Sequence, residues 1–273
     1  MAAANKGRQT TSAKGSQPLK HERIAERLLR DIEDGRWTPG SQLPSEEQLA
    51  DEASASLGTV QRALRSLADM GVVERHHGRG TFVSGASVLG SKTGAKAQER
   101  HLRHFRFFAE GSRTLLPVFF KILDVEETYD SGPWQAALNA QNDRFVKLRR
   151  IVSVNDEFDI FSELYLPADR FGSLIRMPNT RLDGVSIRDM LAERFNAPTL
   201  KTRQTMLCQA FPPRVTRLIN VPTGQYGMVW TICGMSYRET PITWQRIFIP
   251  PSDRVLEIAS APQLDVVGRG SAG

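Results

Sequence analysis

The sequence contains few cysteines and no long apolar run. Its two cysteines, Cys208 and Cys233, belong to no CxxC motif or Cys/His cluster, which argues against a zinc site. Both lie in apolar stretches, so we expect two buried thiols in a reducing cytoplasm, with a redox switch as the alternative. No apolar run approaches the roughly 18 residues that cross a bilayer, so we expect no contact with a membrane.

The residue groupings that enzymes use are also missing. We find no Ser/His/Asp arrangement, no metal-ligand cluster and no GxxxxGK(S/T) phosphate loop, and the last histidine is His104. We therefore expect no catalytic residue, no metal and no cofactor. An enzyme is the less favoured alternative function.

Net charge is +6, which by itself favours a nucleic-acid partner. This positive charge is unevenly distributed. Residues 18–84, which carry the DNA-binding motifs described below, hold nine basic and eleven acidic side chains, so this part of the chain is not basic. Non-specific binding depends on phosphate neutralisation, so a non-specific nucleic-acid-binding protein is the second, less favoured alternative. Residues 1–17 contain little that could be buried and are predicted to be a disordered tail.

Residues 18–84 predict three helices and a hairpin. A stripe of apolar residues runs along Lys20 to Asp34, and Ser45 and Ser56 are good N-caps for two further helices. The third helix ends at Gly71, and two short strands follow around the turn Gly78-Arg79-Gly80.

The third helix and the hairpin carry side chains suited to DNA. Thr59, Gln61, Arg62 and Arg65 are expected on its outer side, where they can bond to base edges or phosphates. An arginine between two glycines can enter a narrow minor groove. The alternative is that these arginines are solvated surface and that the glycines only make a turn.

The ordered motifs LPSE, TVxxALxxL and GxGTFV resemble the winged helix-turn-helix of GntR-type bacterial transcription regulators. The resemblance implies a double-stranded DNA operator as partner. Two arginines usual in the family are replaced by Glu47 and Leu57, which shifts the expected contacts toward the third helix and the hairpin. The predicted DNA-binding residues are Ser45, Ser56, Thr59, Gln61, Arg62, Arg65, His77, Arg79 and Gly80.

Residues 85–103 are small and glycine-rich and are predicted to be a linker. Residues 104–260 alternate in the manner of strands, with hairpins at Asn155-Asp156 and Thr240-Pro241, and residues 261–273 are expected to be a tail. The predicted fold class is α+β, with an antiparallel sheet in the C-terminal domain.

The pattern LRRI…SELYLP at 148–167 resembles the UTRA sensor domain of the HutC subfamily, which has a chorismate-lyase-like fold. The resemblance implies a pocket for a small polar effector, in which Arg150 and Glu163 match an arginine and a glutamate of the family. Tyr165, Arg203 and Tyr237 are weaker candidates. The family's second arginine falls on Val152, which favours a carboxylate or neutral ligand over a phosphorylated sugar. The alternative for Arg150 and Glu163 is a cross-strand ion pair that supports the sheet.

Together, the two resemblances imply a cytoplasmic, sequence-specific transcription regulator, most often a repressor. Its operator binding would respond to a sugar, carboxylate or amino-acid-like metabolite. Because a symmetric dimer reads a palindrome, a homodimer is expected.

Overall fold

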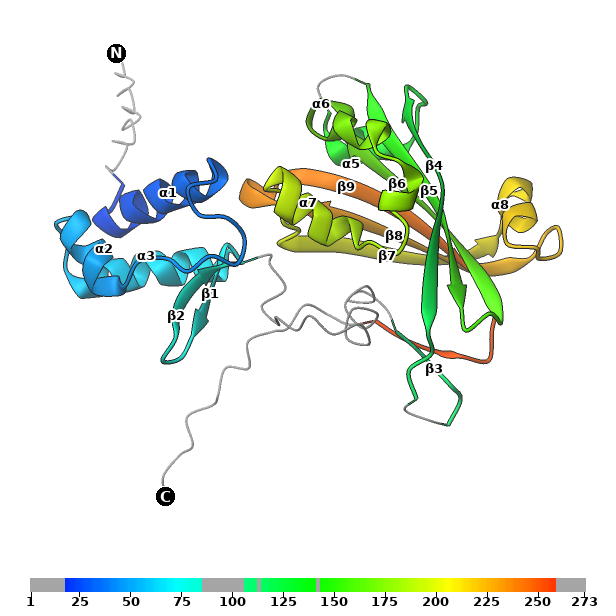
Figure 1. Ribbon diagram of the computed structural model, residues 1–273, viewed down its shortest axis with the longest axis horizontal. Helices are drawn as coiled ribbons and strands as arrows, with labels where there is room; N and C mark the ends of the chain where they lie inside the picture. Colours follow the sequence, from blue (N-terminus) through cyan, green and yellow to red (C-terminus); the bar gives the residue numbers. More distant parts are fainter. Residues whose placement is uncertain (1–17, 85–105, 112–113, 141–142, 259–273) are drawn as a thin grey trace, which may run out of the picture.

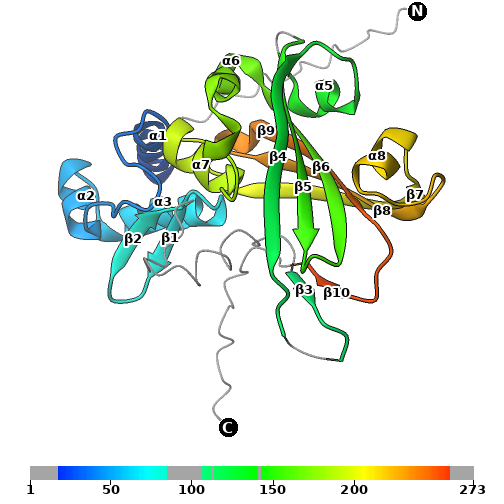
Figure 2. The same cartoon turned by 45° about the vertical axis from the view of Figure 1, so that its right-hand side comes forward.

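The computed structural model describes residues 18–84, 106–111, 114–140 and 143–258, which form a small domain of three helices and a hairpin beside a larger sheet domain (Figures 1 and 2). The predicted α+β class with an antiparallel sheet is confirmed. Three predicted segments lie outside the described residues: the tails at 1–17 and 261–273 and the linker at 85–103. None of the described helices combines the length and apolarity needed to cross a bilayer.

The small domain, residues 18–84, is called the head below. Its helices bury the apolar stripes expected from the sequence, with Leu28, Ile32 and Leu64 fully shielded. Because every helix contributes one apolar side, the three close on a common core that the hairpin covers. The elements are α1 Lys20–Glu33, α2 Glu46–Glu52, α3 Leu57–Asp69, β1 Val73–His76 and β2 Gly80–Val83.

Both predicted N-caps of the head are confirmed. The hydroxyl of Ser45 accepts a hydrogen bond from the backbone N–H of Gln48, whose side chain bonds back to the N–H of Ser45. The hydroxyl of Ser56 accepts a hydrogen bond from the N–H of Thr59 at the start of α3. These bonds satisfy backbone donors that a helix start leaves unpaired, and they fix where α2 and α3 begin.

Six antiparallel strands make the large sheet, in the order β4-β5-β6-β9-β8-β7. The hairpins predicted around Asn155-Asp156 and Thr240-Pro241 are present as β5–β6 and β8–β9. A short ladder between β3 and β10, which the sequence did not predict, packs Phe107 against the sheet. The strands are β3 Arg106–Phe108, β4 Val118–Thr128, β5 Phe145–Val154, β6 Phe158–Pro167, β7 Lys201–Ala210, β8 Tyr226–Met235, β9 Pro241–Ile249 and β10 Val255–Glu257.

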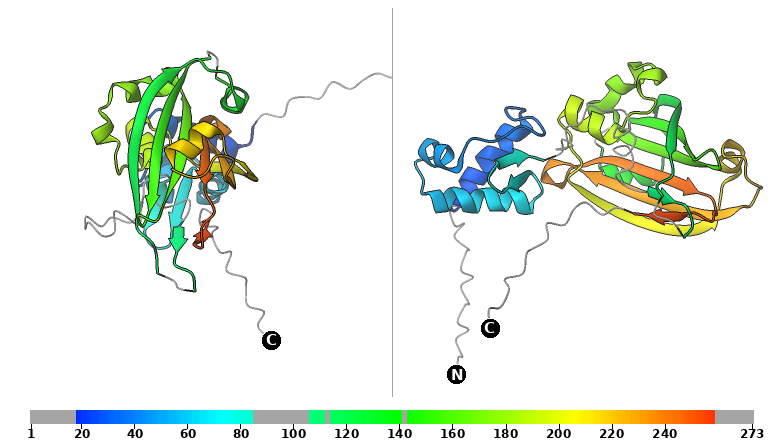
Figure 3. Two further views of the ribbon diagram at one scale, coloured as in Figure 1. Left: turned by 90° about the vertical axis from the view of Figure 1, so that its right-hand side faces the viewer. Right: turned by 60° about the horizontal axis from the view of Figure 1, so that its bottom comes forward.

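Helices cover both faces of this sheet (Figure 3). One face, called the α7 face, packs against α6 Ala168–Phe171, η1 Gly172–Arg176 and α7 Ile187–Phe195. The opposite face, called the α8 face, packs against α5 Pro133–Leu138 and α8 Pro213–Leu218. The remaining short turns of helix are η2 Asn179–Arg181 and η3 Tyr237–Glu239.

The expectation of two buried thiols is wrong. Cys208 is exposed and Cys233 is half-buried. The reason for the first is topological, because β7 is an edge strand and its side chains have no covering layer within the described residues. Burial raises the pKa of the Cys233 thiol, which therefore stays protonated near neutral pH.

The two domains meet at the C-terminal end of α1. The side-chain amide of Asn196, the residue after α7, donates to the carbonyls of Ile32 at 2.9 Å and Glu33 at 3.0 Å. Tyr237 of η3 is buried in the head's apolar core, and Arg238 donates to Glu33 at 2.7 Å. A helix leaves its last carbonyls unpaired and carries a partial negative charge there, so an amide and a guanidinium are suitable partners.

Candidate functional site

The predicted DNA-binding residues lie on α3, at the start of α2 and in the β1–β2 hairpin. Arg62 and Arg65 are exposed on α3 and make no ion pair with another described residue. Thr59 is half-buried, and its hydroxyl lies 2.8 Å from that of Ser56. His77 and Arg79 are exposed at the hairpin tip.

Gly80 shows why a glycine is needed beside the hairpin tip. Its φ is +102°, a backbone conformation that other residues rarely adopt, and a Cβ there would lie 2.7 Å from Nε2 of Gln42. That same Nε2 donates to the carbonyl of Arg79 at 2.9 Å. The close approach therefore ties the hairpin to the segment that leads into α2, and it fixes the position of Arg79.

Glu46 in the first turn of α2 holds two side chains that could otherwise reach DNA. Its carboxylate accepts from Nε2 of Gln61 at 2.8 Å and from the guanidinium of Arg75 at 2.5 Å. Gln61 is half-buried, and this bond occupies its side-chain amide. The sequence predicts a role for Gln61 but does not reveal this partner.

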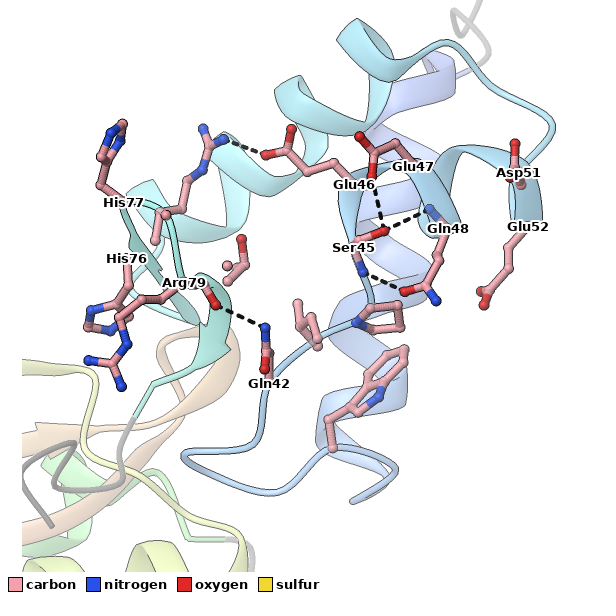
Figure 4. Close-up of a pocket in the computed structure, with 17 residues that line it drawn as sticks. Gln42, Ser45, Glu46, Glu47, Gln48, Asp51, Glu52, His76, His77 and Arg79 are labelled. Carbon is pink, nitrogen blue, oxygen red and sulfur yellow. Dashed lines mark hydrogen bonds and ion pairs between the residues drawn. The ribbon is translucent and has the colours of Figure 1, made fainter.

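An open groove of about 1550 Å³ separates α2 from the hairpin (Figure 4). The α2 side carries Glu47, Asp51 and Glu52, whereas the hairpin side carries His77 and Arg79. Because phosphates repel carboxylates, the hairpin side of this groove is the side that suits a DNA backbone.

On the sheet, Arg150 and Glu163 do not face the same way, so the expectation that they line one pocket is wrong. Arg149 lies opposite Glu163 in the β5–β6 register, and Arg150 lies opposite Ser162. Since neighbouring residues of a strand point to opposite faces, Arg150 lies on the α7 face and Glu163 on the α8 face. The alternative of an ion pair between them is excluded by the same register.

A small cavity of about 60 Å³ lies between the sheet and α7, and Arg150 lines it. Ser186 and Arg188 contribute from the start of α7, and Thr199 and Gln245 contribute further polar groups. The N-terminal end of α7, with its partial positive charge, therefore opens at the cavity. The full lining is Phe120, Arg150, Leu164, Val185, Ser186, Ile187, Arg188, Leu191, Thr199, Thr202, Ile232, Gly234, Thr243 and Gln245, which includes two arginines and no acidic residue.

Arg150 forms no ion pair with any residue in the described part of the chain. Its Nε is buried and has no hydrogen-bond partner among the described residues, and its guanidinium lies 4.9 Å from the ring centre of Phe120. Burial lowers the pKa of Arg150 to about 10, so the side chain is still charged near pH 7. Val152, two residues on, is buried among apolar side chains and adds no donor. The cavity is therefore electropositive and suited to an anion.

Glu163 belongs to a separate network on the α8 face. Its side chain is fully buried, and its carboxylate accepts from Arg246 on β9 at 2.5 Å and from Arg214 on α8 at 3.0 Å. Two guanidiniums thus satisfy the charge of this carboxylate within the protein. Arg149, on the same face, pairs with Asp124, which raises its pKa.

The three weaker candidates are also outside the cavity. Tyr165 stacks on Trp134 with ring centres 3.8 Å apart, and burial raises its pKa. Arg203 lies on the exposed strand β7, and Tyr237 packs into the head. Of the five predicted effector residues, the structure places only Arg150 in the cavity.

The prediction from the sequence missed Arg188, Asn196 and the contact that Arg238 makes with the head. Arg188 had a detectable signal, because a cation in the first turn of a helix opposes the helix dipole and calls for a local reason. Asn196 and Arg238 had none, since their partners Ile32 and Glu33 are more than 160 residues away in the chain.

The burial of Glu163 leads to a stability prediction. Glu163→Ala leaves Arg246 and Arg214 facing an uncompensated buried site, and we expect a loss of about 3 kcal/mol in the free energy of unfolding. Urea denaturation measures it, and Asp159→Ala, on the same strand, serves as the control that should change little. A loss below about 1 kcal/mol would contradict a supporting role for the network.

Comparison with known proteins agrees with this two-part layout. Residues 20–83 match the gntR family of bacterial regulatory proteins, and residues 118–254, half of the chain, match the UTRA domain. The chain is 25% identical over 202 residues to YurK of Bacillus subtilis, an uncharacterized HTH-type transcriptional regulator, covering 69% of this chain and 74% of YurK. It is 39% identical over 70 residues to the histidine utilization repressor of Pseudomonas putida, covering 26% of this chain and 28% of that protein.

Among solved structures, the fold resembles the ligand-binding domain of a regulator from Bordetella bronchiseptica that is assigned to the GntR family. The TM-score is 0.50 at 16% identity, and the match covers 59% of this chain and 98% of that one. The motifs of the head, the sheet topology and both family matches lead to one conclusion. The chain belongs to the GntR family of bacterial regulatory proteins and is a DNA-binding transcription regulator with a C-terminal UTRA effector-binding domain.

Proposed function

We propose that this protein is a homodimeric, cytoplasmic repressor whose operator binding is controlled by a small carboxylate that binds beside Arg150. The observation that carries the proposal is the charge of Arg150, which faces a cavity lined by no acidic side chain. Arg150 is half-buried, and its buried Nε has no hydrogen-bond partner among the described residues. Such a group is costly to leave unsatisfied, so a ligand that supplies an anion gains this interaction. Relatives named as repressors of histidine and fructoselysine utilization support the sign of the regulation.

On the DNA side, the distribution of charge favours contact through α3 and the hairpin. Arg62, Arg65 and Arg79 are exposed and form no ion pair with another described residue, whereas the exposed face of α2 carries Glu47. We propose that Arg62 reads a base in the major groove and that Arg79 reaches the backbone or the minor groove. Ser45, Ser56 and Thr59 lie at helix starts, which supports the proposal that they contact phosphates. His77 and Gly80 belong to the same contact through the hairpin, and Gln61 joins it once Glu46 releases the amide.

The size of the cavity limits what it accepts in this state. About 60 Å³ has room for a few water molecules or one small anionic group. A single unpaired guanidinium beside a helix N-terminus matches a carboxylate. A larger metabolite with a carboxylate therefore has to displace α7 to enter, and that displacement couples binding to a change of conformation.

The route from the cavity to the head is short. Ser186, Arg188 and Leu191 of α7 line the cavity, and Asn196 directly after this helix bonds to the end of α1. We propose that the position of α7 changes when the effector binds and that the head responds to this change. An effector that binds more tightly when α7 is in one of two positions shifts the protein toward that position. The head then adopts the arrangement that this position of α7 favours.

Selection of bound sequences from a random DNA pool at physiological salt tests the regulatory function. We expect a palindrome with two short half-sites, because a two-fold dimer presents two heads. Arg62→Ala should cost about 1–3 kcal/mol at the selected site and relax the preference at one base position.

The control for that substitution is Arg30→Ala, which removes an exposed arginine of α1 and should leave the selected motif unchanged. An equal loss of affinity on all sequences would reassign Arg62 to phosphate contact. A pool without any enriched motif would contradict sequence-specific binding by the free protein.

A second prediction concerns Arg150. Arg150→Met removes a half-buried cation that makes no ion pair with a described residue, so the ligand-free protein should be as stable as the wild type or more stable. Thermal unfolding with millimolar short carboxylates should show stabilisation of the wild type by at least one compound and no stabilisation of the variant.

The neighbouring arginine supplies the matched control. Arg149→Met breaks the pair with Asp124 on the opposite face, so it should lower stability but keep the carboxylate response. A response that survives Arg150→Met would refute the assignment of the cavity. A response to sugar phosphates alone would refute the carboxylate.

A third prediction concerns transmission through Asn196. Its φ is +46°, which glycine adopts freely, so Asn196→Gly removes the amide bonds to α1 without backbone strain. Effectors typically change affinity 5–150-fold, and we expect the variant to lose most of that change while its ligand still binds.

Electrophoretic mobility shifts with and without the active carboxylate measure this coupling. Asn139→Gly is the control, because Asn139 has the same left-handed conformation at the end of α5 but lies on the α8 face, away from the head. If Asn196→Gly keeps the full effect of the ligand, the transmission route does not pass through this residue.

A further inference from the structure

The first turn of helix α3 is open to solvent. Leu57, the first residue of the helix, has 42% of its surface exposed and takes no part in the apolar core of the head. The turn lies on the side of the head that faces away from the large sheet (Figures 1 and 3). An exposed leucine adds little to the stability of the head, because apolar side chains stabilise a fold through the surface that they bury.

Gly58, the next residue, is not required by the fold of the head either. Its backbone is helical, without a positive φ, and a Cβ atom there would meet no atom within 4 Å. Glycine within a helix is less favourable than alanine, so the fold alone favours alanine at this position. The other common reason for a glycine is the close approach of the backbone to a ligand. Gly58 therefore indicates that another molecule comes close to the start of α3.

The hydrogen-bonding side chains around this turn already have partners within the head. The hydroxyls of Ser56 and Thr59 lie 2.8 Å apart, and that of Ser56 also accepts a hydrogen bond from the N–H of Thr59. Gln61 lies one turn farther along the helix, on the same side as Leu57, and its amide donates to Glu46. Among these side chains, Leu57 is the one without polar atoms, so any contact that it makes with a base is apolar.

The apolar group that base pairs present in the major groove is the C5-methyl group of thymine. A helix-turn-helix domain places the N-terminal residues of its second helix, here α3, against the base edges. Side chains of a helix also lean toward its N-terminus, which directs Leu57 toward the groove. A leucine at this point can distinguish thymine from cytosine, whose edge carries an amino donor and no methyl group.

We propose that Leu57 covers the C5-methyl group of one thymine in each operator half-site, and that Gly58 leaves the space which this close approach requires. The contact gives base specificity without a hydrogen bond, unlike the contact proposed for Arg62. This proposal rests on the sequence-specific operator binding of the proposed function, and it names one base group that the head reads.

Deoxyuridine tests the contact without any change to the protein, because it is thymidine without the C5-methyl group. In the palindrome selected from the random pool, each thymine is replaced in turn, in both half-sites together. Replacement at one symmetric position should weaken binding by the wild type about fourfold for each methyl group, and about sixteenfold for the two. Replacement at the other thymines should have little effect.

Leu57→Ala identifies the residue that contacts this methyl group. Alanine keeps the helix and removes the apolar side chain, so the variant should bind the thymine and deoxyuridine operators equally well. Met70→Ala is the matched control, because Met70 is 50% exposed at the opposite end of α3. This control should keep the wild-type difference between the two operators.

Gly58→Ala separates a role in binding from a role in folding. Alanine should raise the midpoint of thermal unfolding, because it is the better helix former and meets no atom of the head. It should lower the affinity for the operator by about fivefold or more, because its methyl group fills space that the DNA needs. Gly172→Ala, at another position where a Cβ atom would meet nothing, is the control and should leave the affinity unchanged.

The outcomes separate this proposal from the one it rests on. A selection without any enriched motif would refute both. A motif that contains no thymine, or that tolerates every deoxyuridine replacement, would refute only the contact with Leu57, as would a deoxyuridine effect that persists in Leu57→Ala. If Gly58→Ala binds the operator as tightly as the wild type does, the start of α3 does not approach the DNA as closely as proposed.

Discussion

The alternation of side chains along β5 and β6 is the constraint on which the effector domain depends. Arg149 and Arg150 are adjacent in the sequence, yet the strand directs them to opposite faces. On the α8 face, Arg149 finds Asp124, and Glu163 is held between two arginines. On the α7 face, Arg150 meets no anionic side chain among the residues that the structure describes. Arg149 thus stabilises the sheet on the α8 face, whereas Arg150 makes the cavity on the α7 face electropositive.

The cavity is connected to the head through α7. It lies under α7, and the residue that ends α7 closes the carbonyl end of α1 in the head. A nine-residue helix is stiff at this length, so its two ends move together. The contact is polar and small, built from Asn196 and Arg238 around the buried ring of Tyr237. Contacts of this kind can be broken and remade at modest cost, as a switch between two arrangements requires.

In the head, Glu47 and Leu57 stand where the family usually has arginines, and Glu46 engages two further side chains that could reach DNA. Glu46 engages Gln61 and Arg75, and the side of the groove formed by α2 is negative. We propose that the binding energy comes from few positive residues, chiefly on α3 and at the hairpin tip. In the proposed homodimer, a second head in the same complex compensates for this small electrostatic contribution.

The sequence alone determined what depends on neighbours in the chain. The caps at Ser45 and Ser56, the apolar stripes of the head helices and the hairpins β5–β6 and β8–β9 all follow from local periodicity and turn residues. Tertiary structure decided what depends on distant partners. Which face Arg150 and Glu163 occupy relative to the helices, the exposure of Cys208 on an edge strand and the bond between Asn196 and α1 all require the strand order and the packing of the domains. Strand periodicity predicts that neighbouring side chains such as Arg149 and Arg150 point to opposite faces, but only the tertiary structure determines which residues each side chain contacts.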